Sequence, residues 1–217
     1  KEGNTRINVK LKGKVETEIN ARGPKITDND ILKLYEKLDR ISDGDTLVLA
    51  GSVPNGLPKD IYEKILSRLS GKGIRFAVDA TGELLTNVLK YHPFLIKPNR
   101  SELEEIVSRE LSSDKEIASA ATELKQKGAV NVLVSLGGDG ALLVDEFGKV
   151  HREKAVAGKV INTVGSGDSM VAGFLVGAEK GYEHALRLGS AAGSATAFSS
   201  GLAGKQEIMD IYRKIRT

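Results

Sequence analysis

Short apolar runs alternate with segments of helical periodicity along most of the chain, and this alternation constrains the fold more than any other feature. Residues 46–50 form an apolar run of strand length, and residues 58–69 place apolar side chains at helical spacing. The same alternation recurs with strand-like runs at 74–78 and 94–96 and a helical segment at 82–91 between them. Such a βαβ rhythm predicts a parallel sheet with helices on both faces.

Helical spacing continues on either side of this region. It predicts further helices at residues 28–41, 101–109 and 113–127. After Thr163 the chain is rich in Gly, Ala and Ser up to Gly204, with Leu, Phe and Val at helical intervals. Because small residues let helix backbones approach closely, we expect tightly packed helices there.

The remaining apolar segments are strand-like. Runs at 130–136 and 141–144 flank Gly137-Gly138-Asp139-Gly140, a spacing that suits a turn between paired strands. Residues 5–12 alternate polar and apolar side chains with the period of a half-buried strand, but no partner strand is evident nearby. We therefore expect an α/β fold with a central, mostly parallel sheet, an antiparallel edge, and helices around it.

Composition narrows the classes of function. With 32 basic and 29 acidic residues, the net charge of +3 gives no general field for nucleic acid or an anionic membrane. The absence of cysteine excludes disulfides, thiolate metal sites and thiol nucleophiles. No apolar run approaches the roughly 20 residues that span a bilayer, and no leader opens the chain, so we expect a cytoplasmic protein of one domain.

The segment from Asn162 to Phe174 carries the strongest chemical signal, because a glycine-flanked turn runs directly into an apolar helix. Gly165 and Gly167 allow close approach of the backbone to a ligand, and the first amides of a helix favour an anion such as phosphate. Asp168 places a carboxylate within reach of a nucleophilic hydroxyl, as phosphoryl transfer requires. The alternative is that Ser166 or Asp168 only caps the helix.

A second glycine-rich segment, residues 135–140, follows the strand-like run that begins at residue 130. This segment exposes backbone amides that could admit the ribose or phosphates of a nucleotide at the carboxyl edge of the sheet. The alternative is a plain hairpin turn. The residues concerned are Ser135, Leu136, Gly137, Gly138, Asp139 and Gly140.

A third segment, residues 96–102, also runs from a strand end into a helix. Lys97 could meet phosphate, and Asn99 and Glu102, three residues apart, could share a face and hold hydrated magnesium. The alternative is an N-terminal helix cap with an ordinary glutamate in the first turn.

Together with residues 50–56, these three segments resemble the ribokinase-type (PfkB) sugar kinases, whose signature is Gly-(Ala/Ser)-Gly-Asp opening a helix. Residues 5–10, 135–140 and 188–198 are similar to the bacterial branch that phosphorylates fructose 1-phosphate. The resemblance covers essentially the whole chain. It implies a ribokinase-like kinase domain over residues 1–217 without the family's usual N-terminal portion, and a lid strand region at residues 5–26.

The resemblance also implies roles for individual residues. Asp168 would take the proton from the sugar hydroxyl, and the amides of Gly165, Ser166 and Gly167 would stabilise the phosphoryl group in transfer. Arg6 would face the sugar phosphate. The other implied residues are Ser52 at the sugar phosphate, Lys97, Asn99, Gly167, Asp168 and residues 135–140 at the ATP site, and Asn99 with Glu102 at magnesium, through water.

The implied reaction is ATP- and Mg²⁺-dependent phosphorylation of a ketose phosphate, with fructose 1-phosphate giving fructose 1,6-bisphosphate. Tagatose 6-phosphate is the alternative substrate. A nucleotide-binding module without catalysis, or a regulatory domain on a kinase-like scaffold, is the alternative of another class. We expect a small-molecule sugar phosphate as the partner, no nucleic acid or membrane, and a homodimer formed through pairing of the lid strand.

Overall fold

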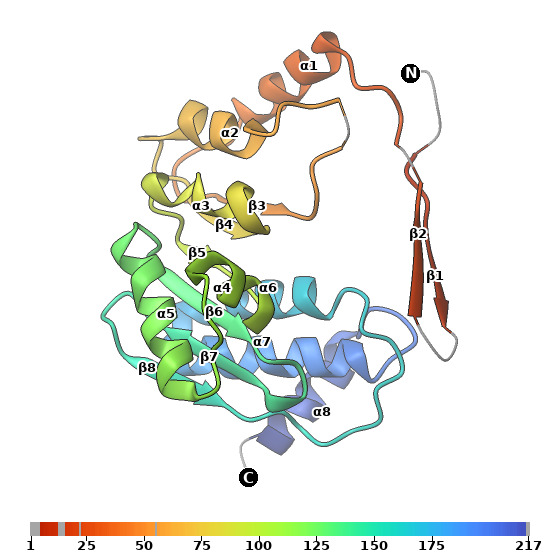
Figure 1. The fold of residues 1–217 in the computed structure, drawn as a ribbon, viewed down its shortest axis with the longest axis vertical. Coiled ribbons are helices and arrows are strands. Elements are labelled where there is room, and N and C mark those ends of the chain that lie inside the picture. The colour runs from red at the N-terminus through yellow and green to blue at the C-terminus, as the bar shows by residue number, and fades with distance from the viewer. Residues whose placement is uncertain (1–4, 13–15, 22, 55, 216–217) are drawn as a thin grey trace.

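A mixed sheet of six strands forms the centre of the molecule (Figure 1), seen in a computed structural model that describes residues 5–12, 16–21, 23–54 and 56–215. The first four strands are parallel, and the last three pair in antiparallel fashion. This arrangement confirms the expected α/β fold with an antiparallel edge. In spatial order the strands are β3 (Thr46–Ala50), β4 (Arg75–Asp79), β5 (Leu95–Ile96), β6 (Asn131–Ser135), β7 (Ala141–Val144) and β8 (Val150–Glu153).

Helices cover both faces of the sheet because successive strand residues point to opposite sides. On one face Val78, Ile96 and Val132 share a core with the helices that connect the parallel strands. On the other face Ala77 and Leu133 pack against the two glycine-rich helices. The first set comprises α2 (Ile61–Leu69), α3 (Gly82–Thr86), α4 (Arg100–Val107) and α5 (Asp114–Gln126), and the second comprises α6 (Ser166–Gly177) and α7 (Tyr182–Ala197).

The helices α6 and α7 pack closely through their glycines, as their composition predicts. A Cβ atom on Gly173 would lie 2.7 Å from the carbonyl oxygen of Leu188, and one on Gly189 would lie 2.8 Å from that of Met170. Gly193 in turn faces the Ser166 carbonyl, where a Cβ would lie 3.1 Å away. This packing fixes the start of α6 against the middle of α7.

Two helices lie at the margins of the body. The helix α1 (Asp28–Leu38) packs beside α2, and Thr27 closes a capping box with Asp30 at its start. The helix α8 (Lys205–Ile215) packs on α7 and shares a small core with it. Among the described residues, no helix has the length and apolar character needed to cross a membrane.

The expected helix at 82–91 is shorter than its pattern suggested. After α3 the chain forms a 3₁₀ turn, η1 (Leu89–Tyr91), and His92 then adopts a left-handed conformation with φ of 51°. Pro93 follows and disfavours helical backbone at the residue before it, so the helix cannot continue. Two further 3₁₀ turns are η2 (Gly137–Asp139) and η3 (Ala178–Lys180).

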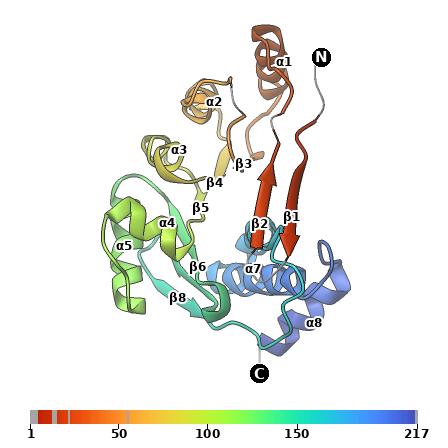
Figure 2. The same ribbon diagram turned by 45° about the vertical axis from the view of Figure 1, so that its right-hand side comes forward.

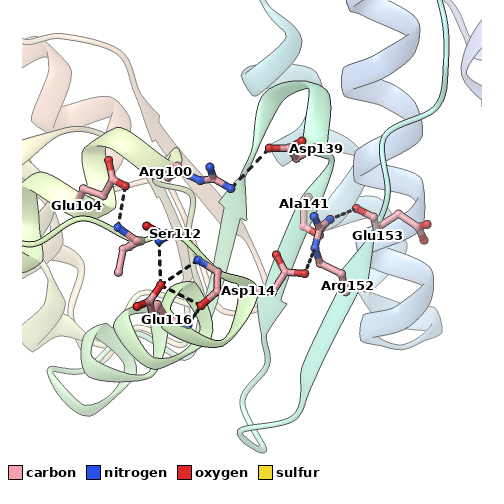
Figure 3. A network of polar contacts seen from close by, with 11 residues as sticks. Arg100, Glu104, Ser112, Asp114, Glu116, Asp139, Ala141, Arg152 and Glu153 are labelled. Carbon is pink, nitrogen blue, oxygen red and sulfur yellow. Dashed lines mark hydrogen bonds and ion pairs between the residues drawn. The ribbon is translucent and has the colours of Figure 1, made fainter.

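The edge strand β8 was not predicted, because its sequence Val-His-Arg-Glu contains a single large apolar residue. Polar contacts hold it in place (Figure 3). The Arg152 guanidinium donates to the Ala141 carbonyl on β7 and, at 2.8 Å, to the Asp114 carboxylate at the start of α5.

The N-terminal part forms a separate antiparallel pair, β1 (Asn8–Lys12) with β2 (Glu16–Asn20). The strand at 5–12 was predicted correctly, but the expectation that it has no partner nearby is wrong. Residues 16–20 contain one apolar residue, Ile19, so the period-two signal is weak there. Figures 1 and 2 both show the pair standing beside the main body.

Candidate active site

A cavity of about 670 Å³ lies at the carboxyl ends of β5 and β6, beside the start of α6. The parallel pairing of these strands brings the segments after them together, and an isolated bridge joins Asn99 to Ser135. The amide of Ser135 also donates to the Pro98 carbonyl at 3.1 Å. Ligands of α/β proteins commonly bind at this edge of a sheet. The lining includes Lys97, Asn99, Ser135, Gly137, Gly138, Gly140, Thr163, Ser166 and Gly167.

A second hollow, of about 740 Å³, follows the exposed side of α1. Its lining mixes lysines with Asp30 and Glu36 and includes no glycine. None of the residues predicted for chemistry lies there, so the cavity beside α6 is the candidate site.

The first turn of α6 has no side-chain cap, in contrast to α1, α4 and α5, which each begin with a capping box. Gly165 occupies the N-cap position with φ of 80°, a left-handed conformation that glycine adopts at little cost. Ser166 and Asp168 therefore do not act as the simple caps considered above. The Ser166 amide donates to the Thr163 carbonyl at 3.2 Å, and the Ser166 hydroxyl is buried without a hydrogen-bond partner in the described residues.

An ion pair between a buried lysine and a partly buried aspartate lies directly beneath this turn. The Lys97 ammonium is 3.2 Å from the Asp79 carboxylate, and Lys97 is only 6% exposed. A Cβ atom on Gly167 would lie 3.2 Å from that ammonium, so glycine lets the turn rest on the lysine. Burial raises the pKa of the Asp79 carboxyl; the Lys97 charge opposes this rise, and Asp168 and Glu102 add to it.

Asp79 is the site residue that the sequence reasoning missed. It ends β4, the strand beside β5 in the parallel sheet, so its side chain reaches the same edge as Lys97. The available signal was a lone carboxylate at the end of an otherwise apolar strand, Arg-Phe-Ala-Val-Asp.

Asn99 and Glu102 form a reciprocal capping box at the start of α4. The Glu102 amide donates to the Asn99 side-chain oxygen, and the Asn99 amide donates to the Glu102 carboxylate, both at 2.8 Å. The helix-cap alternative is therefore realised. Among the residues described, no group of three or more His, Cys, Asp or Glu side chains could hold a metal ion. Magnesium coordination by these two residues stays a prediction.

The segment from Ser135 to Gly140 is both a hairpin turn and a wall of the cavity. Ser135 and three of its glycines line the space, whereas Leu136 is buried in the core and 7% exposed. Asp139 turns outward, where its carboxylate lies 3.6 Å from the Arg100 guanidinium (Figure 3). The side chains of Leu136 and Asp139 thus do not line the cavity.

The residues predicted to contact the sugar phosphate, which is the phosphoryl acceptor, come from distant parts of the chain. Arg6 donates to the Ser52 hydroxyl at 2.8 Å across 46 positions of sequence, and it also donates to Asn8 at 2.9 Å. Asp168 has an exposed side chain in the first turn of α6, close enough to raise the pKa of Asp79. The Arg6–Ser52 pair and Asp168 therefore lie on different parts of the fold.

Comparison with known proteins gives consistent results. Residues 1–209 match the model of the pfkB family carbohydrate kinases. The chain is 43% identical to 1-phosphofructokinase of Bacillus subtilis over 99% of its own length and 71% of that protein. It is 39% identical to D-tagatose-1-phosphate kinase of Bacillus licheniformis over 93% of its own length and 67% of that protein.

A solved structure agrees with these sequence matches. Phosphofructokinase-2 from Escherichia coli, in complex with substrates and products, superimposes with a TM-score of 0.87 and 33% identity, covering 94% of this chain and 67% of that one. The glycine-opened helix with its aspartate and the matched length point the same way: the chain belongs to the pfkB family of carbohydrate kinases.

Proposed function

We propose that this chain is the nucleotide-binding and phosphoryl-transfer part of a sugar-phosphate kinase that converts fructose 1-phosphate and ATP to fructose 1,6-bisphosphate and ADP. The observation that carries the proposal is the uncapped, glycine-opened start of α6, which rests on the buried pair of Lys97 and Asp79. The similarity to 1-phosphofructokinases supports the choice of sugar.

The cavity suits the phosphates of ATP. Lys97 supplies a positive charge held in place by Asp79, and the glycines at 137, 138 and 140 allow the backbone to approach the nucleotide. The first turn of α6 directs helix amides and the positive end of the helix dipole toward the same space. A preorganised set of donors of this kind stabilises the charge that develops on a phosphoryl group in transfer.

Asp168 is the proposed general base. Its carboxylate takes the proton of the acceptor hydroxyl while the hydroxyl oxygen forms a bond to the γ-phosphorus, and the bond from that phosphorus to the bridging oxygen of ADP breaks. The exposed position of Asp168 leaves its carboxylate open to an approaching substrate.

Magnesium fits this site as a hydrated ion held mainly by phosphate. Glu102 and Asp168 both lie close enough to Asp79 to raise the pKa of its carboxyl, but among the described residues the three carboxylates do not form a metal-binding group. Asn99 and Glu102 would hold the ion through water, as is common for Mg²⁺. When bound, the ion neutralises charge on the phosphate oxygens.

The acceptor side would be formed by Arg6 and Ser52, which contact each other. An arginine can bind a phosphate through two parallel hydrogen bonds, which suits the phosphate already present on the sugar. Residues 5–26 would then act as a lid. Ile7, Val9, Leu11 and Ile19 are all more than 40% exposed, and they would support pairing of two such lids in a homodimer.

A second candidate substrate is tagatose 1-phosphate, favoured by the 39% identity to a kinase named for it. Tagatose 6-phosphate is a further alternative. The full-length protein should be assayed for ADP release with fructose 1-phosphate, fructose 6-phosphate and both tagatose phosphates.

We expect the highest kcat/KM with fructose 1-phosphate. A higher kcat/KM with a tagatose phosphate would change the proposed substrate and leave the proposed chemistry intact. Binding of ATP without turnover of any of the four sugars would instead identify a nucleotide-binding module.

A further inference from the structure

A buried tyrosine is hydrogen-bonded to the chain just before Ser52. Tyr62, in the first turn of α2, is 8% exposed and belongs to the core on that face of the sheet. Its hydroxyl lies 3.0 Å from the Ala50 carbonyl oxygen and 3.1 Å from the Gly51 carbonyl oxygen. The hydroxyl therefore shares its one proton between two consecutive carbonyls at the end of β3. The chemistry proposed above gives Tyr62 no role.

A turn at Gly51 brings the two carbonyls to the same hydroxyl. In an extended strand, successive carbonyls point to opposite sides. Gly51 instead has φ of 83°, a left-handed conformation that glycine adopts at little cost. Its amide donates to the Asp79 carbonyl on β4 at 3.2 Å. The peptide groups on both sides of Gly51 are thus held by hydrogen bonds.

The anchored Gly51 carbonyl also sets the direction of the Ser52 amide. A trans peptide group is planar, and its N–H points away from its C=O. Because the Gly51 carbonyl points to the buried Tyr62 hydroxyl, the Ser52 N–H points away from it. Ser52 is exposed, and no group in the described part of the chain accepts a hydrogen bond from its amide. The amide is therefore available to a ligand, next to the Ser52 hydroxyl that Arg6 contacts at 2.8 Å.

The surroundings of Tyr62 keep its hydroxyl a donor. Burial raises the pKa of Tyr62, and the nearby Asp79 carboxylate adds to this rise. The neutral phenol is therefore favoured, and the hydroxyl retains the proton that it donates. A phenylalanine at this position would fill nearly the same space but would hold neither carbonyl.

We propose that Tyr62 is a positioning residue for the sugar phosphate: by holding the Gly51 carbonyl, it aims the Ser52 amide at the phosphate that Arg6 binds. The role of Tyr62 rests on the proposed function, which places this phosphate at Arg6 and Ser52. A backbone amide is a good donor to a charged phosphate oxygen, and a donor fixed before binding loses little freedom when the ligand arrives. Tyr62 acts through Ser52 and does not itself touch the substrate.

The test compares Tyr62→Phe with Tyr182→Phe in the full-length protein. Both changes remove one phenol hydroxyl and keep the ring. Tyr182 is the matched control because its hydroxyl donates to the Glu146 carboxylate at 2.6 Å, and Tyr182 lines neither of the two cavities described above. The quantities measured are kcat and the KM for the preferred sugar phosphate at saturating ATP, the dissociation constant of ATP, and the melting temperature.

We expect Tyr62→Phe to raise the KM for the sugar phosphate about 3- to 10-fold, the scale of weakening one hydrogen bond to a charged group. Both kcat and the dissociation constant of ATP should stay within about 2-fold of wild type, because only binding of the acceptor is affected. Tyr182→Phe should keep the wild-type KM, although both variants lose a hydrogen bond and therefore some melting temperature.

A second measurement reports on the Ser52 amide directly. Nuclear magnetic resonance of protein labelled with nitrogen-15 at serine observes the serine amides, and the signal that is lost in Ser52→Ala belongs to Ser52. We expect the sugar phosphate to move the Ser52 amide proton of wild type and of Tyr182→Phe downfield, as a new hydrogen bond does. The same proton should move less far in Tyr62→Phe.

An unchanged KM for the sugar phosphate in Tyr62→Phe would overturn the inference. So would an equal rise in Tyr182→Phe, since that result indicates a general loss of stability, or a Ser52 amide signal of wild type that does not respond to the sugar phosphate. A wild-type protein that phosphorylates none of the four sugars would overturn the proposed function, and the role of Tyr62 with it.

Discussion

The two sides of the candidate site differ in how the chain builds them. On the nucleotide side, Lys97 is only 6% exposed and is fixed by the packing of strands and helices. On the acceptor side, Arg6 and Ser52 are exposed and held by a contact between two surface segments. The nucleotide pocket is therefore preformed by the core, whereas the sugar side depends on a few exposed contacts.

The strongest test of this contrast lies where the two sides meet. We expect Asp168→Asn in the full-length protein to lower kcat by roughly 10²–10⁴, the scale of losing a general base. Because the nucleotide pocket is preformed, the dissociation constant of ATP should change little. Steady-state kinetics and calorimetry measure the two quantities, and unchanged turnover would remove Asp168 from its role.

A substitution on the acceptor side should weaken binding of the sugar phosphate alone. Arg6→Ala is expected to raise the KM for the sugar phosphate by roughly 10- to 100-fold, since it removes charge-assisted hydrogen bonds to phosphate. The affinity for ATP and the melting temperature should stay near those of wild type, because Arg6 is exposed. Weaker ATP binding with unaltered sugar KM would reverse the assignment of the two sides.

A substitution in the helix pair behind the nucleotide pocket should act through packing. Gly173→Ala would place a Cβ 2.7 Å from the Leu188 carbonyl, so we expect a loss of about 1–3 kcal/mol in the free energy of unfolding. Gly201→Ala is the matched control, since a Cβ there meets nothing within 4 Å. Denaturant unfolding of both variants makes the comparison; equal stability would show that α6 and α7 can separate at little cost.

A buried charge far from the cavity should affect stability without affecting function. Burial opposes ionisation of Asp145, but hydrogen bonds from His151 and from the amides of Lys149 and Phe147 outweigh it, and the pKa of the Asp145 carboxyl is lowered. A lowered pKa contributes stability above the unfolded value of 3.8, and that stability is lost as pH falls below it.

Asp145→Asn should therefore lower the free energy of unfolding by about 1–2 kcal/mol at pH 7. The difference from wild type should be smaller near pH 3, and the KM for ATP should not change. Denaturant unfolding curves of both proteins at the two pH values test this prediction. A stability difference that grew toward low pH would contradict the lowered pKa of Asp145.

Much of the fold could be predicted because it follows from local periodicity. The strands at 46–50 and 74–78 and the antiparallel edge after residue 135 were recognisable from apolar runs and glycine turns. The β8 strand and the partner strand at 16–20 were not, because polar contacts and pairing hold them rather than an alternating pattern.

The site was predictable only where sequence neighbours act together. The glycines and aspartate that open α6 stand in one segment, so their common role could be inferred. Asp79 meets Lys97 through the order of the strands in the sheet, which no local pattern encodes. For Asn99 and Glu102 the same spacing fits a magnesium site and a capping box, and local sequence cannot choose between them.

The most direct test of the central claim is a crystal structure of the full-length protein with fructose 1-phosphate and a non-hydrolysable ATP analogue. We predict a γ-phosphate within hydrogen-bond distance of the amides in the first turn of α6 and of the Lys97 ammonium, with the acceptor hydroxyl between that phosphate and Asp168. A nucleotide bound elsewhere, or with its γ-phosphate turned away from α6, would contradict it.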